Sequence, residues 1–172
     1  MRQIAFLAHR LEKVTFAADA RTHEITDVQR ERYAEMRREL ETYGTVVSSR
    51  TSGVMSRVST PPEGILVTQS DREAHERRGR IRTQHALLDV IEKSQVLVAA
   101  IDGESETRGS LIEHAHALRK GVLLLQQYAN IHIFRPMYEN REGIDFVVYR
   151  DAQEMRLALR RFFNRYPVQS YG

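Results

Sequence analysis

Short apolar runs and longer amphipathic segments alternate along the chain. Five continuous runs are rich in Val, Ile, Leu and Ala, and each is five to seven residues long. They are residues 3–8, 45–49, 95–101, 121–127 and 144–149. Runs of this length and composition are typical of β-strands that are buried on both faces of a sheet.

Segments with a helical period separate these runs. They are residues 27–43, 82–93, about 110–119 and 151–163. Strands that alternate with helices predict a parallel sheet that is covered on both sides. We therefore expect an α/β fold, with a single domain over residues 1–172. Its centre should be a doubly wound, five-stranded parallel sheet of the Rossmann-like or flavodoxin-like type, an αβα sandwich.

One connection is longer than a strand-to-helix link usually is. It covers residues 50–70, and loops of this length without structure of their own are uncommon in compact domains. We expect a lid or an oligomer arm there. The alternative is a short extra strand formed by "GILVTQ", residues 64–69.

Composition narrows the class of protein. A chain of 172 residues with 41% apolar residues can build one sizeable core. The 26 basic and 23 acidic residues nearly balance, so nucleic-acid binding is not demanded by the charge. The absence of cysteine excludes disulfides, thiolate nucleophiles and cysteine-based zinc sites, which suits a cytoplasmic protein. No stretch approaches the roughly 18 apolar residues of a membrane helix, so we expect no membrane partner.

The polar segment after the third apolar run lies where this fold class keeps its ligands. In open parallel sheets, ligands bind beyond the carboxyl ends of the strands. Asp102 and Gly103 follow the run directly, and Gly109 and Ser110 open the next helix. The free amides of a first helical turn can bind an anion or a sugar hydroxyl. Asp102 has an alternative role in a tight turn with Gly103.

Glu113 lies one turn into the same predicted helix. A carboxylate held against the crevice can attack an electrophilic carbon or position a water molecule. The alternative is structural, because Ser110 and Glu113 have the spacing of a capping box, in which both side chains satisfy backbone donors.

Cationic residues near the other strand ends are candidates for phosphate binding. His9 and Arg10 follow the first strand, and Arg108 precedes the predicted helix. The planar fork of donors of an arginine suits a phosphate group. A surface ion pair between Arg10 and Glu12 and a solvated charge at Arg108 are the alternatives.

His114 and His116 do not predict a metal site. A step of two residues on a helix turns by about 200°, so the two rings cannot bind one ion from the same face. We expect neither a metal nor a cofactor. His116 lies one turn from Glu113 and is expected either to be solvated or to hydrogen-bond that carboxylate.

Five stretches taken together resemble the nucleoside 2-deoxyribosyltransferase superfamily, including its branch that hydrolyses the base from nucleoside 5′-monophosphates. They span most of the chain and read "IAFLAHR", "YGTVVSS", "IEKSQVLVAAIDG", "RGSLIEHAHALRKGVLLL" and "GIDFVVYRDAQEMRLALRRFF".

The resemblance implies a site and an activity. Glu113 corresponds to the family's catalytic glutamate, which acts at the anomeric carbon, and Gly109 and Ser110 correspond to the Gly-Thr pair that receives the sugar or phosphate. Asp102 and Gly103 correspond to the family's Asp-Gly turn. The family forms dimers or larger homo-oligomers in which the segment after the fourth strand reaches a neighbour's site, and here that segment is Asn130 to Arg135.

One departure bears on the chemistry. The family has a catalytic aspartate where this chain has Leu87. Asp89 is two helix steps away and points to another side, and His85 is a substitute only if the helix shifts.

The expected function is hydrolysis of the N-glycosidic bond of a nucleoside 5′-monophosphate or nucleoside. The alternatives are a non-catalytic nucleotide-binding module and, from another class, a structural or nucleic-acid-associated protein that uses its arginines.

Overall fold

A five-stranded parallel sheet forms the centre of the protein. The computed structural model describes residues 3–7, 14–15, 22–23, 27–48, 69–101, 108–128 and 135–169. The strands are β1 (Gln3–Leu7), β4 (Thr45–Ser48), β5 (Val96–Ala100), β6 (Gly121–Gln127) and β7 (Ile144–Tyr149). Their order is β4-β1-β5-β6-β7, and every pair is parallel. The predicted fold class is therefore confirmed, with strand boundaries that differ by at most one residue.

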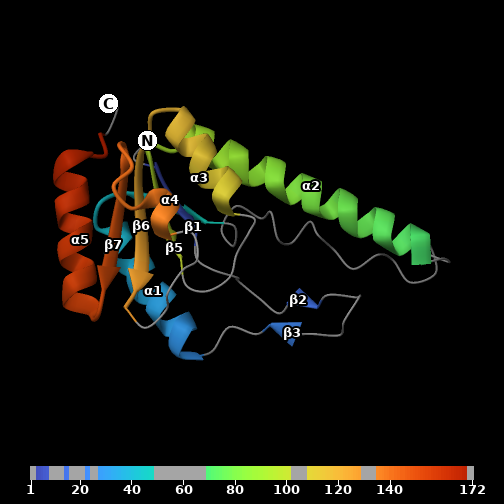
Figure 1. Cartoon of the computed structure of the whole chain (residues 1–172), viewed down its shortest axis with the longest axis horizontal. Coiled ribbons are helices and arrows are strands. Elements are labelled where there is room, and N and C mark those ends of the chain that lie inside the picture. The colour runs from blue at the N-terminus through green and yellow to red at the C-terminus, as the bar shows by residue number, and fades with distance from the viewer. Residues whose placement is uncertain are drawn as a thin grey trace.

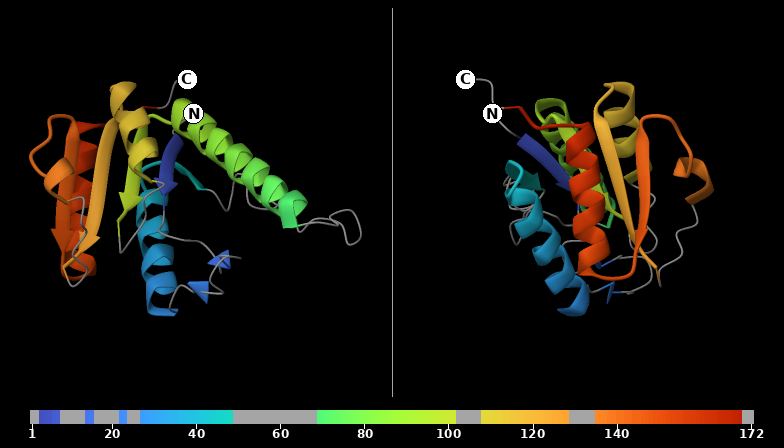
Figure 2. Two further views of the ribbon diagram at one scale, coloured as in Figure 1. Left: turned by 45° about the vertical axis from the view of Figure 1, so that its right-hand side comes forward. Right: turned by 90° about the vertical axis from the view of Figure 1, so that its left-hand side faces the viewer.

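Helices cover both faces of this sheet. They are α1 (Asp27–Glu41), α2 (Gln69–Lys93), α3 (Arg108–Ala117), the short α4 (Arg135–Tyr138) and α5 (Ala152–Arg165). α1 and α5 lie on one face, whereas α2 and α3 lie on the other (Figures 1 and 2). A small antiparallel pair, β2 (Val14–Thr15) and β3 (Thr22–His23), lies apart from the main sheet.

Alternation along the central strands divides the core into two layers. In β5, Val96, Val98 and Ala100 join a cluster with side chains of α1 and α5. Leu97 and Ala99 point to the opposite face and join a cluster with side chains of α2 and α3. Successive strand residues point to opposite faces, so a strand between two helical layers has to be apolar at every position.

Strand order reverses between β1 and β5. The chain passes from β1 through α1 to β4 on one side, and then returns through α2 to β5 on the other side of β1. In this class of fold the carboxyl ends of strands at such a reversal border the ligand crevice. β5 is followed by α3, whose first turn consequently begins at this edge of the sheet.

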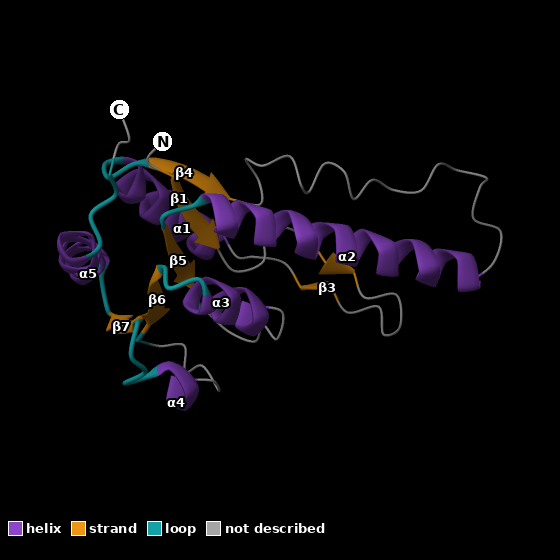
Figure 3. Cartoon of the chain, turned by 90° about the horizontal axis from the view of Figure 1, so that it is seen from above, coloured by secondary structure: helices purple, strands orange, loops and turns teal. Residues whose placement is uncertain are grey.

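α2 is longer than its hydrophobic period predicts. The helix begins at Gln69 rather than near residue 82, and its first half extends beyond the sheet (Figures 1 and 3). The added part, residues 69–81, is almost entirely polar and contains Gly79, so it has no apolar face that the period could reveal. The lid or arm expected at residues 50–70 lies outside the described residues as far as residue 68.

Candidate functional site

One stripe of α3 faces α4 and the turn that leads into β7. Gly109, Glu113 and His116 are spaced four and three residues apart, which places them on one side of a helix. At the start of the stripe the backbone passes close to Tyr138 of α4, because a Cβ atom built on Gly109 would lie 3.4 Å from its hydroxyl oxygen. A side chain at this position would therefore be in van der Waals contact with the tyrosine hydroxyl.

The Glu113 carboxylate is paired with Arg141, which lies between α4 and β7. The two guanidinium nitrogens of Arg141 donate to the two carboxylate oxygens, with Nη2 to Oε2 at 2.8 Å. This is the two-pronged geometry in which arginine binds carboxylates most strongly. The side chains of Arg141 and Glu113 remain 33% and 44% exposed, so the pair stays accessible from solvent.

His116 supports the same turn from the next position of the stripe. Its Nε2 lies 2.8 Å from the carbonyl oxygen of Glu142 and therefore donates a hydrogen bond, since a carbonyl can only accept. Its Nδ1 lies 3.4 Å from Nη2 of Arg141. Gly143 closes the turn with a φ of +82°, and a Cβ there would lie 3.1 Å from His116 Nε2. Glycine suits both the positive φ and the short distance to His116, because it has no Cβ atom.

These neighbours determine the charges of the site. The hydrogen bond from Arg141 lowers the pKa of the Glu113 carboxyl group, partial burial opposes it, and the charges of Arg141 and His116 lower it further. Burial raises the pKa of Tyr138, and the negative charge of Glu113 raises it further. At neutral pH the site therefore combines a carboxylate, a guanidinium cation and a neutral phenol.

The capping-box alternative for Glu113 does not fit the observed helix. α3 begins at Arg108, so Ser110 is the third residue of the helix rather than the residue before it. The Oγ of Ser110 accepts a hydrogen bond from Nε2 of Gln84 at 2.9 Å, which joins the first turn of α3 to α2.

α2 carries no carboxylate at the position where the resemblance expects one. Leu87 is partly buried and packs against the core between the sheet, α2 and α3. Asp89 is exposed and pairs with Lys93 at 2.7 Å, and His85 is also exposed. Gln84, one turn before Leu87 on α2, contacts α3 through Ser110.

Five of the predicted substrate-binding residues have side chains that the structure does not describe. His9, Arg10, Asp102 and Gly103 lie outside the described residues. Arg108 is the first residue of α3, and its side chain is likewise not described.

Arg135 begins α4 and donates two hydrogen bonds to Glu139, at 2.9 and 3.2 Å. Its guanidinium also lies 5.9 Å from the ring centre of Phe146. Arg135 is therefore engaged within its own chain segment.

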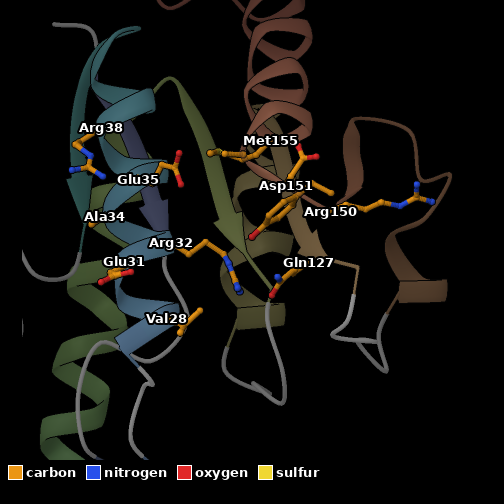
Figure 4. A pocket seen from close by; sticks show the side chains of 12 residues that line it. Val28, Glu31, Arg32, Ala34, Glu35, Arg38, Gln127, Arg150, Asp151 and Met155 are labelled. Atoms are coloured by element: carbon orange, nitrogen blue, oxygen red, sulfur yellow. The ribbon is translucent and has the colours of Figure 1, made fainter.

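A separate pocket of about 710 Å³ lies on the opposite face of the sheet, at the carboxyl ends of β6 and β7. α1 and the start of α5 form its walls, and Figure 4 shows Arg32 and Gln127 pointing toward one another across it. Two of its acidic groups have partners, because Glu35 pairs with Arg156 at 3.0 Å and Asp151 caps α5. None of the described residues that line the pocket was predicted to bind substrate.

The two neighbouring histidines of α3 face different elements. His114 Nε2 lies 3.1 Å from a carboxylate oxygen of Glu92 on α2, whereas His116 contacts the turn before β7. Over the described ranges, no three His, Asp or Glu side chains gather closely enough to bind a metal ion. None of the helices described is both long and apolar enough to cross a membrane.

Sequence reasoning missed Arg141 and Tyr138, the partners of the α3 stripe. Neither belongs to a motif, and nothing local distinguishes Arg141 from the other arginines that make up most of the 26 basic residues. Asn140 and Gly143, which flank this stretch, are local signals of a tight turn, but they do not single out the arginine between them.

No protein-family model matches the chain, and no curated protein sequence matches it either. The likeness to the nucleoside 2-deoxyribosyltransferases consequently rests on the motifs of the sequence.

Proposed function

We propose that the protein is an N-glycosidase that hydrolyses nucleoside 5′-monophosphates or nucleosides and releases the free base, with Glu113 acting at the anomeric carbon. The observation that carries this proposal is the state of Glu113. Its carboxylate is held ionised by Arg141 and is 44% exposed on the helix that follows β5. An ionised, accessible and oriented carboxylate is what attack on a sugar carbon requires.

The chemistry follows from this one group. A Glu113 oxygen forms a bond to C1′ while the bond between C1′ and the base nitrogen breaks, and the electron pair of that bond leaves with the base. Water then cleaves the glycosyl ester and restores the carboxylate. The arginine does not prevent this attack, because a carboxylate has about four lone-pair sites and the two hydrogen bonds occupy two of them.

The leaving base takes its proton from water in this proposal. Leu87 is apolar and packs into the core, and Gln84 is an amide, so neither of these two side chains of α2 can act as a general acid. Without such an acid, hydrolysis is favoured over controlled transfer of the sugar between two bases.

A non-catalytic nucleotide-binding module is the second candidate. It is favoured by the apolar Leu87 and by the engagement of both Glu113 oxygens in one ion pair. Under this hypothesis the Glu113–Arg141 pair is purely structural and stabilises the packing of the turn before β7 against α3.

We also propose that the protein is a homodimer in which a second copy covers the first half of α2. This half extends beyond the sheet, and Ile81 on it is 51% exposed.

The function is tested by incubating the purified protein with a panel of nucleosides and nucleoside 5′-monophosphates and separating released bases by chromatography. We expect release from at least one substrate and loss of release in Glu113→Gln. The matched control is Glu41→Gln, which removes another partly exposed carboxylate that pairs with an arginine, Arg37 of α1. Tight binding of a mononucleotide by calorimetry, with no base released on long incubation, would establish the second candidate instead.

A further inference from the structure

We propose that Arg141 is a positioning residue for the reaction: it fixes the orientation of the Glu113 carboxylate and thereby sets the lower pH limit of activity. This inference rests on the proposed function of Glu113. Arg141 itself does not touch the substrate in this proposal and acts only through the glutamate.

The geometry of the pair carries the inference. A glutamate on a helix surface ordinarily samples several rotamers, and the two parallel hydrogen bonds from Arg141 select one of them. The donors come from a different element, 28 residues further along the chain, so the orientation is defined relative to the sheet and not only to α3.

Arg141 is itself held in place. Nδ1 of His116 lies 3.4 Å from Nη2 of Arg141, and Nε2 of the same ring donates to the carbonyl oxygen of Glu142, so one ring contacts both the arginine side chain and the backbone next to it. The φ of +82° at Gly143 then turns the chain into β7. The guanidinium is thus presented by a braced turn rather than by a free loop.

Three charged or titratable side chains among the described residues face Glu113 from the elements around it. They are Arg141 from the turn before β7, His116 from α3 and Tyr138 from α4. Arg141 and His116 favour the ionised glutamate, and burial opposes it. Removing the Arg141 charge should therefore raise the pKa of Glu113, and activity that needs the carboxylate should fail at a higher pH than in the wild type.

The test compares Arg141→Gln and Arg141→Lys with the wild type in the pH dependence of kcat/KM for base release. For Arg141→Gln we expect kcat to fall by about tenfold or more, since misplacement of a reacting group has effects of this size. We also expect a nearly unchanged KM and an acid limb moved to higher pH. Arg141→Lys keeps the charge without the fork, so its acid limb should stay near that of the wild type while kcat recovers in part.

The control is Arg165→Gln, which breaks a different ion pair of β7, that of Arg165 with Asp145 at 2.7 Å. It should leave the acid limb unchanged. A second readout does not need turnover: a ¹³C NMR titration of glutamate labelled at the carboxyl carbon, with the Glu113 signal assigned from Glu113→Gln. Its midpoint should rise in Arg141→Gln.

The outcomes separate the two proposals. If the wild type releases base and Arg141→Gln leaves both the acid limb and the NMR midpoint unchanged, the positioning role is wrong while the glycosidase stands. If the wild type releases no base from any substrate in the panel, the proposed function is wrong, and the positioning role is overturned with it. A raised midpoint, a shifted acid limb and partial recovery by lysine support the inference.

Discussion

The ion pair between Glu113 and Arg141 should contribute only a small coupling energy to the free energy of unfolding, and this coupling energy should depend on pH. The perturbation is a double-mutant cycle of Glu113→Gln, Arg141→Gln and the double variant. Such a cycle isolates the interaction from the other consequences of each substitution. The free energies of unfolding of the two single variants, measured in the same cycle, show directly whether a catalytic loss in either variant reflects unfolding.

The magnitude follows from the exposure of the pair. Exposed ion pairs contribute about 0–1 kcal/mol, and the side chains here are 33% and 44% exposed. The two-pronged geometry places this pair at the upper end of that energy range, so we expect a coupling energy of about 1 kcal/mol near neutral pH. In a domain of this size that free energy corresponds to a shift of roughly 2–4 °C in Tm.

The sign with pH follows from the lowered pKa of Glu113. A carboxyl group with a depressed pKa in the folded state contributes stability above its unfolded-state pKa. This contribution is lost as the pH falls through the folded-state value. The coupling should therefore be present at neutral pH and should decline on acidification below the ordinary glutamate range.

Urea unfolding followed by far-UV circular dichroism measures the cycle, since the chain has no tryptophan to serve as a fluorescent probe. A coupling of about 3 kcal/mol or more would refute the reasoning, because that is the size expected when a buried pair is broken. An equal coupling at neutral and at acidic pH would refute it as well.

Three further predictions concern stability and assembly. Gly121→Ala should lower the free energy of unfolding by about 1–3 kcal/mol, because its Cβ would lie 2.7 Å from the Tyr166 ring. Chemical denaturation should show a smaller loss when the same substitution is made in a Tyr166→Ala background. An equal loss in the two backgrounds would contradict the steric clash. Asp151→Ala should cost about 1 kcal/mol in the same assay, because its side chain accepts from the Glu154 amide at 2.9 Å at the start of α5, whereas Asp151→Asn should retain most of the cap. Ile81→Glu should convert the proposed dimer to a monomer in sedimentation velocity experiments, and a monomeric wild type would disprove that interface.

The sequence was most informative where apolar residues follow a short period. Each predicted strand of the sheet is present, and β6 and β7 have the predicted bounds, because a strand between two helical layers is apolar at nearly every position. The same reasoning failed for α2, whose first half has no apolar face, and for α4, which is only four residues long.

In the candidate site, too, the sequence was informative only for features that depend on spacing along a single helix. A local motif identified Glu113, and the helical step correctly separated His114 from His116, since both depend only on spacing along one helix. Whether Glu113 caps its own helix or meets another element was left open by the spacing.

Only the tertiary structure decided the partner of that carboxylate. The sheet brings α3 beside the turn before β7, and this places Arg141 against a glutamate 28 residues earlier in the chain. The same packing buries Leu87 and joins Gln84 to Ser110. Such contacts depend on how separate elements pack against one another, and this packing produces no periodic pattern in the sequence. A strand or a helix does produce a periodic pattern, because its own backbone repeat determines which side chains share a face.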